Sequence, residues 1–170
     1  MSKLTAIPYK FNDDGQIPNN PDLPLLVYPG AMKDEPGRIE AVFNRNNWRN
    51  SWTNGVYGYH HYHSNSHEVL GVQSGSAAIQ AGGEHGKSIE LGAGDVIVLP
   101  AGTGHKLLTA SPDFKVVGAY PDGMEYNLLR SGEGKRPDVL EEIRRVPLPD
   151  TDPLFGADGP LIELWKKGSA

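Results

Sequence analysis

Residues 55–68 read GVYGYHHYHSNSHE and hold four of the six histidines in the chain. In an extended strand successive side chains point to opposite faces, so Tyr57, Tyr59, His61 and His63 are expected to share one face. Two imidazoles that lie two residues apart on one wall of a sheet can converge on a single metal ion. This stretch therefore predicts a strand whose paired histidines either hold part of a metal site or lie at the surface, and the residues around them decide between the two.

The other three histidines are not expected to be metal ligands. His60 alternates to the opposite face and is expected to pack or to meet solvent. His67 precedes Glu68 and should point away from it, unless a bulge just before it turns the ring inward. His85 lies in a glycine turn and is expected to face solvent. Of these three, only His67 is a candidate for supporting the site.

Short strands separated by glycine turns extend on both sides of the histidine stretch. The expected strands are 56–63, 68–72, 77–81, 88–91, 96–99, 105–109 and 114–120. The 21 glycines and 14 prolines supply the turns between them. Closely spaced strands of this kind are typical of a β-sandwich or a β-barrel, so we expect an all-β core.

We expect a single domain over residues 1–170, with its core barrel at about 52–121. An N-terminal arm, 1–51, and a C-terminal arm, 122–170, flank that core. Prolines crowd the apolar segment 25–28, which we expect to be at most an edge strand. A short helix is expected in each arm, between Pro36 and Asn46 and between Pro137 and Pro147. A closing apolar patch is expected at Leu161, Leu164 and Trp165.

Composition excludes several classes of protein. The 170 residues hold 16 basic and 21 acidic side chains, a net charge of −5, without a block of like charge. Nucleic acid and membrane are therefore not expected partners, and a small-molecule ligand is. Because there is no cysteine, any metal here has only nitrogen and oxygen ligands. No apolar run approaches the roughly 18 residues of a membrane span, and we expect a cytoplasmic protein.

Two spaced motifs extend the histidine stretch. The first is Gly55, five residues, His61-Tyr62-His63, four residues, Glu68, six residues and Gly75. The second is Gly94, five residues, Pro100, one residue, Gly102, two residues and His105. They resemble the two motifs of the cupin superfamily, except that Thr109 stands where the family commonly has Asn. The flanking sequences resemble the YjlB type of uncharacterised single-domain bacterial cupins, for which no reaction is established.

The resemblance implies a small jelly-roll β-barrel (the RmlC-like fold) with His61, His63, Glu68 and His105 as ligands of one divalent metal. Three imidazoles and a carboxylate suit Fe, Mn, Ni, Zn or Co and do not distinguish between them. Glu68 either binds the ion or orients a ligand from outside. If the ion is six-coordinate, two positions stay open, and the net positive site favours an anionic, bidentate oxygen ligand.

Further residues are expected around the ion. Tyr57 and Tyr59 are the candidates for donating a hydrogen bond or proton to a bound ligand, although both also suit aromatic filling of a narrow barrel. Thr109 is expected to line the same cavity, and Arg49 either reaches an anionic ligand or forms a surface salt bridge. Leu70, Val72 and Leu107 would make the rest of the wall apolar.

Two functions remain open. The first is a metal-dependent small-molecule enzyme of dioxygenase, isomerase or lyase type. The second is a non-catalytic cupin that binds a small ligand and keeps a structural or vestigial metal site. Cupins carry out many reactions, so the fold does not choose between these functions. A homodimer is expected in either case, because the sheet edges of a jelly roll need cover.

Overall fold

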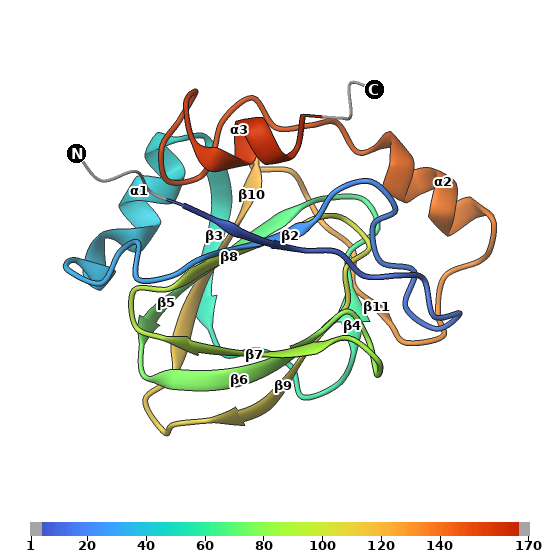
Figure 1. Cartoon of the computed structure of the whole chain (residues 1–170), viewed down its shortest axis with the longest axis horizontal. Helices are drawn as coiled ribbons and strands as arrows, with labels where there is room; N and C mark the ends of the chain where they lie inside the picture. Colours follow the sequence, from blue (N-terminus) through green and yellow to red (C-terminus); the bar gives the residue numbers. More distant parts are fainter. Residues whose placement is uncertain (1–4, 167–170) are drawn as a thin grey trace.

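The structure of the chain is a computed structural model that describes residues 5–166. Two antiparallel sheets face one another, and the three α-helices of the described residues lie along one side of the molecule (Figure 1). The first sheet has the order β1 (Ile7–Tyr9), β2 (Leu25–Tyr28), β8 (Val96–Leu99), β5 (Glu68–Ser74), β10 (Lys115–Pro121) and β3 (Trp48–Asn54). The second has the order β11 (Leu129–Arg130), β4 (His61–Tyr62), β9 (His105–Ala110), β6 (Ser76–Ala81) and β7 (Lys87–Gly92). The expected all-β jelly-roll fold is confirmed.

The middle strands of the first sheet are buried on both faces, which explains why β2 and β8 read as unbroken apolar runs, LLVY and VIVL. Val116 points into the space between the sheets, whereas Val117 points to the other side, against the helices. The inner core is made by residues such as Leu70, Ile79 and Ile97. The chain therefore builds one core between the sheets and a second one behind the first sheet.

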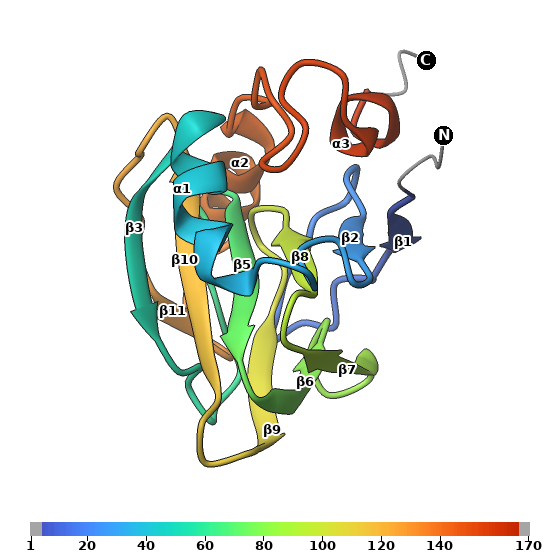
Figure 2. The same ribbon diagram turned by 90° about the vertical axis from the view of Figure 1, so that its left-hand side faces the viewer.

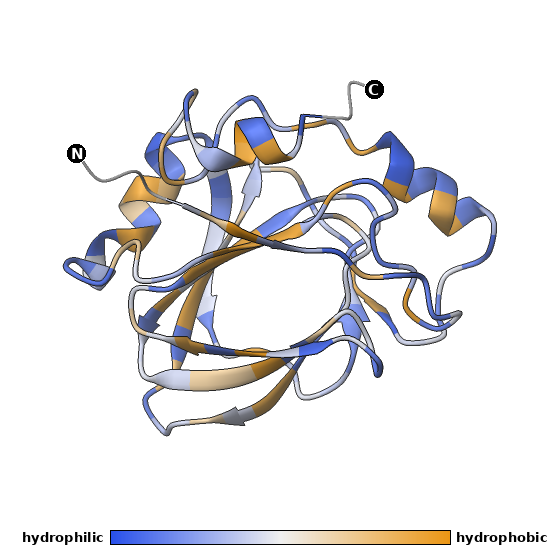
Figure 3. Ribbon diagram, in the orientation of Figure 1, coloured by the Kyte–Doolittle hydropathy of each residue, from blue (hydrophilic) through white to orange (hydrophobic). Residues whose placement is uncertain are grey.

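The core behind the first sheet is covered by α1 (Ile39–Arg45), which follows a 3-10 helix, η1 (Pro36–Arg38). Its buried face packs over the first sheet (Figure 2). A close approach is needed there: a Cβ added to Gly71 would lie 2.6 Å from Cγ2 of Ile39. In Figure 3, α1 is hydrophobic on one side and hydrophilic on the other, as its spacing of Ile39, Val42 and Phe43 predicts.

The C-terminal arm adds α2 (Asp138–Arg145) and α3 (Pro160–Leu164). Asp152 fastens this arm: it is fully buried and accepts hydrogen bonds from the Tyr28 hydroxyl and from three backbone N–H groups. Leu161 and Trp165 are buried as expected, but Leu164 is 39% exposed and does not belong to the closing patch. Of the helices described, none is both long enough and apolar enough to cross a membrane.

Two expectations about strands are wrong. Segment 25–28 is not an edge strand, because β2 lies between β1 and β8. The strand expected over 56–63 forms only at β4, and a strand that was not expected, β3, precedes it. The backbone of 56–60 makes single hydrogen bonds to two different segments: Leu107 N–H donates to the Tyr57 carbonyl and Ser131 N–H to that of His60. A continuous ladder is therefore absent from 56–60.

Candidate metal centre

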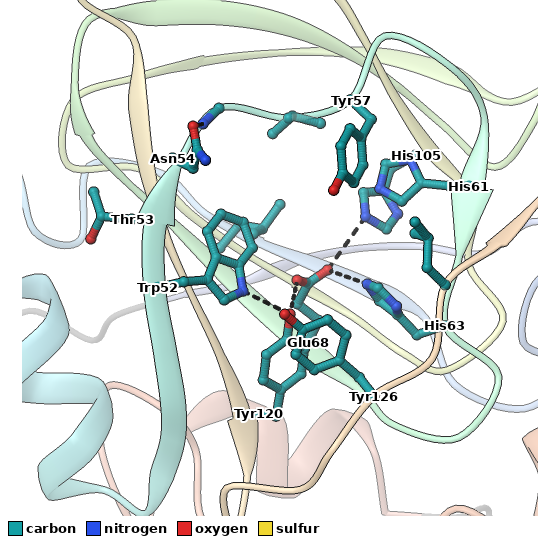
Figure 4. A pocket seen from close by; sticks show the side chains of 14 residues that line it. Trp52, Thr53, Asn54, Tyr57, His61, His63, Glu68, His105, Tyr120 and Tyr126 are labelled. Carbon is teal, nitrogen blue, oxygen red and sulfur yellow. Dashed lines mark hydrogen bonds and ion pairs between the residues drawn. The ribbon is translucent and has the colours of Figure 1, made fainter.

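The four ligands expected from the motifs meet between the two sheets. His61 lies in β4, His63 directly after it, and His105 begins β9, whereas Glu68 begins β5 on the facing sheet. His61 and His105 are register partners in adjacent strands. All four side chains are at most 7% exposed. Figure 4 shows them converging on one point at the wall of a cavity.

Glu68 lies closest to two of the imidazoles. Its Oε1 is 3.2 Å from Nε2 of His63 and 3.3 Å from Nε2 of His105. The ligand atoms of these three residues lie within 4.8 Å of one another, and His61 is not part of that group. The ring of His61 lies beside that of His105, with 4.1 Å between the ring centroids. The structure thus brings three of the four together tightly and places the fourth next to them.

The three imidazoles are oriented in the same way. Nδ1 of His61 is 3.0 Å from the carbonyl of Tyr59, Nδ1 of His105 is 3.1 Å from that of Thr103, and Nδ1 of His63 contacts that of Asn127. A carbonyl only accepts, so each Nδ1 carries a hydrogen, and in the neutral form of each ring Nε2 is then free to bind a cation. Histidines that bind metals have their second nitrogen held in this way.

The two carboxylate oxygens of Glu68 have different surroundings. Oε2 accepts a 2.8 Å hydrogen bond from the Tyr120 hydroxyl, whose oxygen accepts a 2.8 Å bond from Trp52 Nε1–H. Oε1 is buried and has no hydrogen-bond partner. Buried polar atoms without partners are rare, and this one faces Nε2 of His63 and of His105. A cation placed among these atoms would satisfy all of them, so the donor set fits a divalent ion.

The charges of the site are consistent with this arrangement. Burial raises the pKa of Glu68, but His63 and His105 lower it more, so its pKa lies well below the usual range. Burial, with His105 beside it, lowers the pKa of His61 to about 3. Burial also lowers the pKa of His63, but the Glu68 carboxylate outweighs burial and raises it. Glu68 is therefore charged at neutral pH and His61 is neutral, as metal ligands need to be.

The cavity beside these residues has a volume of about 460 Å³. The Trp52 and Leu70 side chains line its interior, and the exposed side chains of Tyr57, Tyr126 and Leu128 also line it. This volume lies within the range of roughly 300–1,000 Å³ that is usual for small-ligand sites. The candidate metal centre thus lies at the wall of a space large enough for a small molecule.

Comparison with known proteins gives the family. The cupin domain model matches residues 52–117. The uncharacterized protein YjlB of Bacillus subtilis is 48% identical over 159 residues, which cover 94% of this chain and 96% of that protein. This chain belongs to the cupin family, as a YjlB-type member. Both the motif resemblance and the flanking resemblance are therefore confirmed.

Solved cupin structures are more distant in sequence. Acireductone dioxygenase from Bacillus anthracis is 22% identical with a TM-score of 0.37; the match covers 53% of this cupin and 60% of that chain. A conserved protein with a double-stranded β-helix domain from Klebsiella pneumoniae is 16% identical with a TM-score of 0.39. That match covers 78% of this cupin and 86% of the other chain. This cupin thus spans less than two thirds of the dioxygenase.

The two candidate tyrosines of this cupin stack on one another, and one of them lines the cavity. Tyr57 lines the cavity, and its ring centroid is 5.3 Å from that of His61. Tyr59 is not among the described lining residues; it stacks on Tyr57 at 5.0 Å, and the guanidinium of Arg130 lies 4.0 Å from its ring centroid. The Tyr59 ring also lies beside that of His61, with 5.7 Å between the ring centroids, so both tyrosines remain next to this imidazole although the segment is not a continuous strand.

Thr109 is not where the sequence predicted, whereas Arg49 lies at the surface, the second of the two places expected for it. Thr109 is exposed and does not line the cavity, because a bulge leaves Leu108 without a partner in β6 and reverses the alternation of β9 beyond Leu107. Arg49 donates to the Asn47 side chain and to the Asp122 carbonyl at the surface, and it does not reach the cavity.

The other three histidines are placed as expected. His60 pairs with Glu84, and His85 is exposed in its turn. His67 is buried and points away from Glu68: its Nδ1 accepts from Ala101 N–H at 2.9 Å, and its Nε2–H donates to the Pro147 carbonyl at 3.2 Å. His67 therefore ties the loop before His105 to the C-terminal arm.

Sequence reasoning missed three aromatic or polar residues of the site. Tyr120 could have been found, because Val116, Gly118 and Tyr120 alternate onto the inner face of one strand. Tyr126 and Asn127 lie in an irregular segment that no periodicity marks. Asn127 lies outside the first motif but holds it in place: its side-chain oxygen accepts from the Ser64 backbone N–H, and its amide nitrogen donates to the Ser64 hydroxyl.

Proposed function

We propose that this cupin binds one divalent transition metal through His61, His63, Glu68 and His105 and uses it to hold a small anionic oxygen ligand. One observation carries the proposal: three imidazoles donate through Nδ1 to backbone carbonyls, and the unpartnered Oε1 of Glu68 faces two of them. A bound divalent ion would supply Lewis-acid polarisation of a bidentate ligand and, if redox-active, a site for dioxygen.

The reaction we favour is of dioxygenase, isomerase or lyase type, and the chain's own residues suit it. Leu70 and the rings of Trp52 and Tyr120 give the cavity a mostly apolar wall beside the site. The Tyr120 hydroxyl already donates to Glu68, so it holds the carboxylate. Tyr57 is the remaining candidate for donating a hydrogen bond to a bound ligand, and Tyr59 supports its ring.

A non-catalytic ligand-binding cupin is the second candidate, and one observation favours it. Among the described residues that line the cavity, the only groups able to exchange a proton, apart from the four proposed ligands, are hydroxyl groups. A protein that only holds its ligand needs no general acid or base. The metal would then serve in recognition.

Elemental analysis tests the metal site. The protein would be purified without a metal-affinity column and compared with a His61→Ala/His105→Ala double variant and with His60→Ala, a matched control whose imidazole pairs with Glu84. Wild type and His60→Ala should carry close to one metal per chain, and the double variant far less. Equal, substoichiometric metal in all three would show that the assignment is wrong.

The metal found decides the next assay. Iron would lead to oxygen-consumption measurements with a panel of candidate ligands, and zinc or nickel to isomerase and lyase substrates. Full metal loading with no turnover in either panel would favour the binding protein.

We also propose that the protein is a cytoplasmic homodimer. The first sheet ends in β1 and β3 and the second in β11 and β7, so four strand edges are unpaired within the described chain. Such edges are normally covered or protected. Sedimentation that shows only monomer at micromolar concentration would reject the dimer.

A further inference from the structure

The cavity has very little charge. Of the 14 described residues that line it, Glu68 is the only carboxylate, and none is Lys or Arg. Arg130 follows the segment at the mouth, but its guanidinium lies over the ring of Tyr59 and is not part of the lining. A divalent ion held by Glu68 and neutral imidazoles therefore leaves a net charge of about +1 to be matched by a ligand.

Aromatic rings surround the candidate metal position. Tyr57 lies beside His61, and Tyr126 lies beside His63 at 5.2 Å between ring centroids. Tyr126 stacks on Tyr120 at 4.1 Å and 17°. In Figure 4 the Tyr57 ring lies on one side of the Glu68 carboxylate, and the Trp52, Tyr120 and Tyr126 rings on the other.

The outermost members of this wall are unusually exposed for large apolar groups. Tyr57 is 54% exposed, Tyr126 40% and Leu128 39%, and all three line the cavity. Exposed apolar groups that gather at one concave place mark a binding surface more often than isolated ones do. The surface they offer suits a flat, apolar group that enters from the mouth.

From this charge and this wall we infer that the ligand is a monoanionic oxygen chelator with a flat aromatic or apolar body, of the type of an enolised hydroxyketone. The inference rests on the metal centre proposed above and goes beyond it by excluding ligands with two negative charges and polyhydroxylated ligands. A dicarboxylate or a phosphate ester would bring a second negative charge into a site with no cationic side chain to pair with it, which is costly away from water. A polyhydroxylated sugar would leave the aromatic wall without an apolar partner.

Three chelators distinguish the effect of the ligand's charge on affinity from the effect of its apolar group. Acetohydroxamate and benzohydroxamate carry the same monoanionic chelating group and differ only by methyl against phenyl, whereas oxalate is a dianion with no body. The protein is first loaded with Co(II), and its stoichiometry and affinity are measured before any chelator is added. Each chelator is then titrated into the Co(II) protein while the visible spectrum is followed. Its affinity for the Co(II) protein is divided by the affinity of the same chelator for free Co(II).

Benzohydroxamate is expected to bind about tenfold more tightly than acetohydroxamate, because the phenyl group packs on the aromatic wall. Oxalate is expected to bind least well after the same correction. Tyr126→Ala should reduce the gap between the two hydroxamates to about threefold or less; both are titrated against the same Co(II)-loaded variant, so this gap does not depend on the Co(II) affinity. Tyr9→Ala, which removes a tyrosine outside the cavity, should leave the gap intact. Leu128→Ala, matched to Leu108→Ala outside the cavity, repeats the comparison if Tyr126→Ala fails to fold.

The outcomes are distinguishable. Failure of wild type to bind Co(II) would overturn the metal centre and is seen before any chelator is added. Stoichiometric Co(II) with preferred oxalate would overturn the ligand class alone. Hydroxamates of equal affinity, or a gap that Tyr126→Ala and Leu128→Ala both leave unchanged, would do the same.

Discussion

The Tyr120 hydroxyl donates a 2.8 Å hydrogen bond to Oε2 of Glu68, and Oε1 of the same carboxylate is left facing Nε2 of His63 and of His105. The hydroxyl is itself fixed by Trp52 Nε1–H at 2.8 Å. One oxygen of the carboxylate is therefore held by the protein and the other is free for a cation. Glu68 is thus arranged to bind a metal ion through one of its two carboxylate oxygens.

Replacing Tyr120 with Phe removes this hydrogen bond and keeps the ring. We expect Tyr120→Phe to weaken divalent metal binding by about 10- to 100-fold, the range usual for groups that orient a ligand. Competition titration with a chromophoric chelator measures the affinity, and the visible spectrum of the Co(II) form should change because the carboxylate can rotate. Tyr9→Phe is the control. Unchanged affinity in Tyr120→Phe would show that Glu68 needs no such support.

Gly118 lies under the Trp52 ring, and a Cβ added at this position would overlap the indole. We therefore expect Gly118→Ala to displace Trp52 and to lower the free energy of unfolding by about 1–3 kcal/mol. Metal affinity should also fall, because Trp52 orients Tyr120. Urea denaturation measures the free energy of unfolding, tryptophan fluorescence reports the displacement of Trp52, and competition titration measures the metal affinity. Gly37→Ala, where an added Cβ meets nothing within 4 Å, should have little effect on either.

The jelly roll was predictable because its signals are local. Glycine turns and apolar runs mark β5 to β10, and each was expected within two residues of its observed bounds. His61 and His63 could be paired from their spacing, and His105 could be added through the resemblance of the second motif to cupins. Alternation fails where the backbone departs from a regular ladder, as at Thr109 beyond the bulge and in the irregular segment that holds Tyr57. Neither departure leaves a mark in a single sequence.

The support of the site is less predictable because it comes from distant segments. Asn127 is 64 positions beyond His63 in the sequence and holds its Nδ1–H through a backbone carbonyl, which any residue type could supply. Tyr126 reaches the cavity only because the segment after β10 folds back over the mouth. Such contacts are set by tertiary packing, so residue type and periodicity do not reveal them.

Asp152 and Tyr28 provide a test of how the C-terminal arm is held. Removing the buried carboxylate with Asp152→Ala leaves the Tyr28 hydroxyl and three backbone N–H groups unsatisfied. We expect a loss of about 3 kcal/mol or more in the free energy of unfolding, and about 1–3 kcal/mol for Tyr28→Phe. Urea denaturation measures both, and the exposed neighbour offers the control Asp150→Ala. Equal effects of Asp152→Ala and Asp150→Ala would contradict this view.

Metal removal should destabilise the folded protein in a pH-dependent way. The folded chain gathers the four ligands and the unfolded chain does not, so metal at 100 times its Kd adds about 2.7 kcal/mol to the stability. Imidazoles bind metal only when Nε2 is unprotonated, and despite burial the Glu68 carboxylate raises the pKa of His63 above its ordinary value of about 6.5, so protons compete with the metal as pH falls through that raised pKa. The metal-dependent part of Tm is therefore present above the pKa of His63 and lost as pH falls toward about 5.

Thermal melts of dialysed and Zn(II)-loaded protein at about pH 7.5 and pH 5 measure this difference. His105→Ala should show little difference between the two forms at either pH, because one of the three imidazoles is gone. His60→Ala should behave as wild type, since its imidazole pairs with Glu84 outside the site. A Zn(II)-dependent Tm shift that survives in His105→Ala, or that is as large at the lower pH, would place the metal elsewhere on the protein.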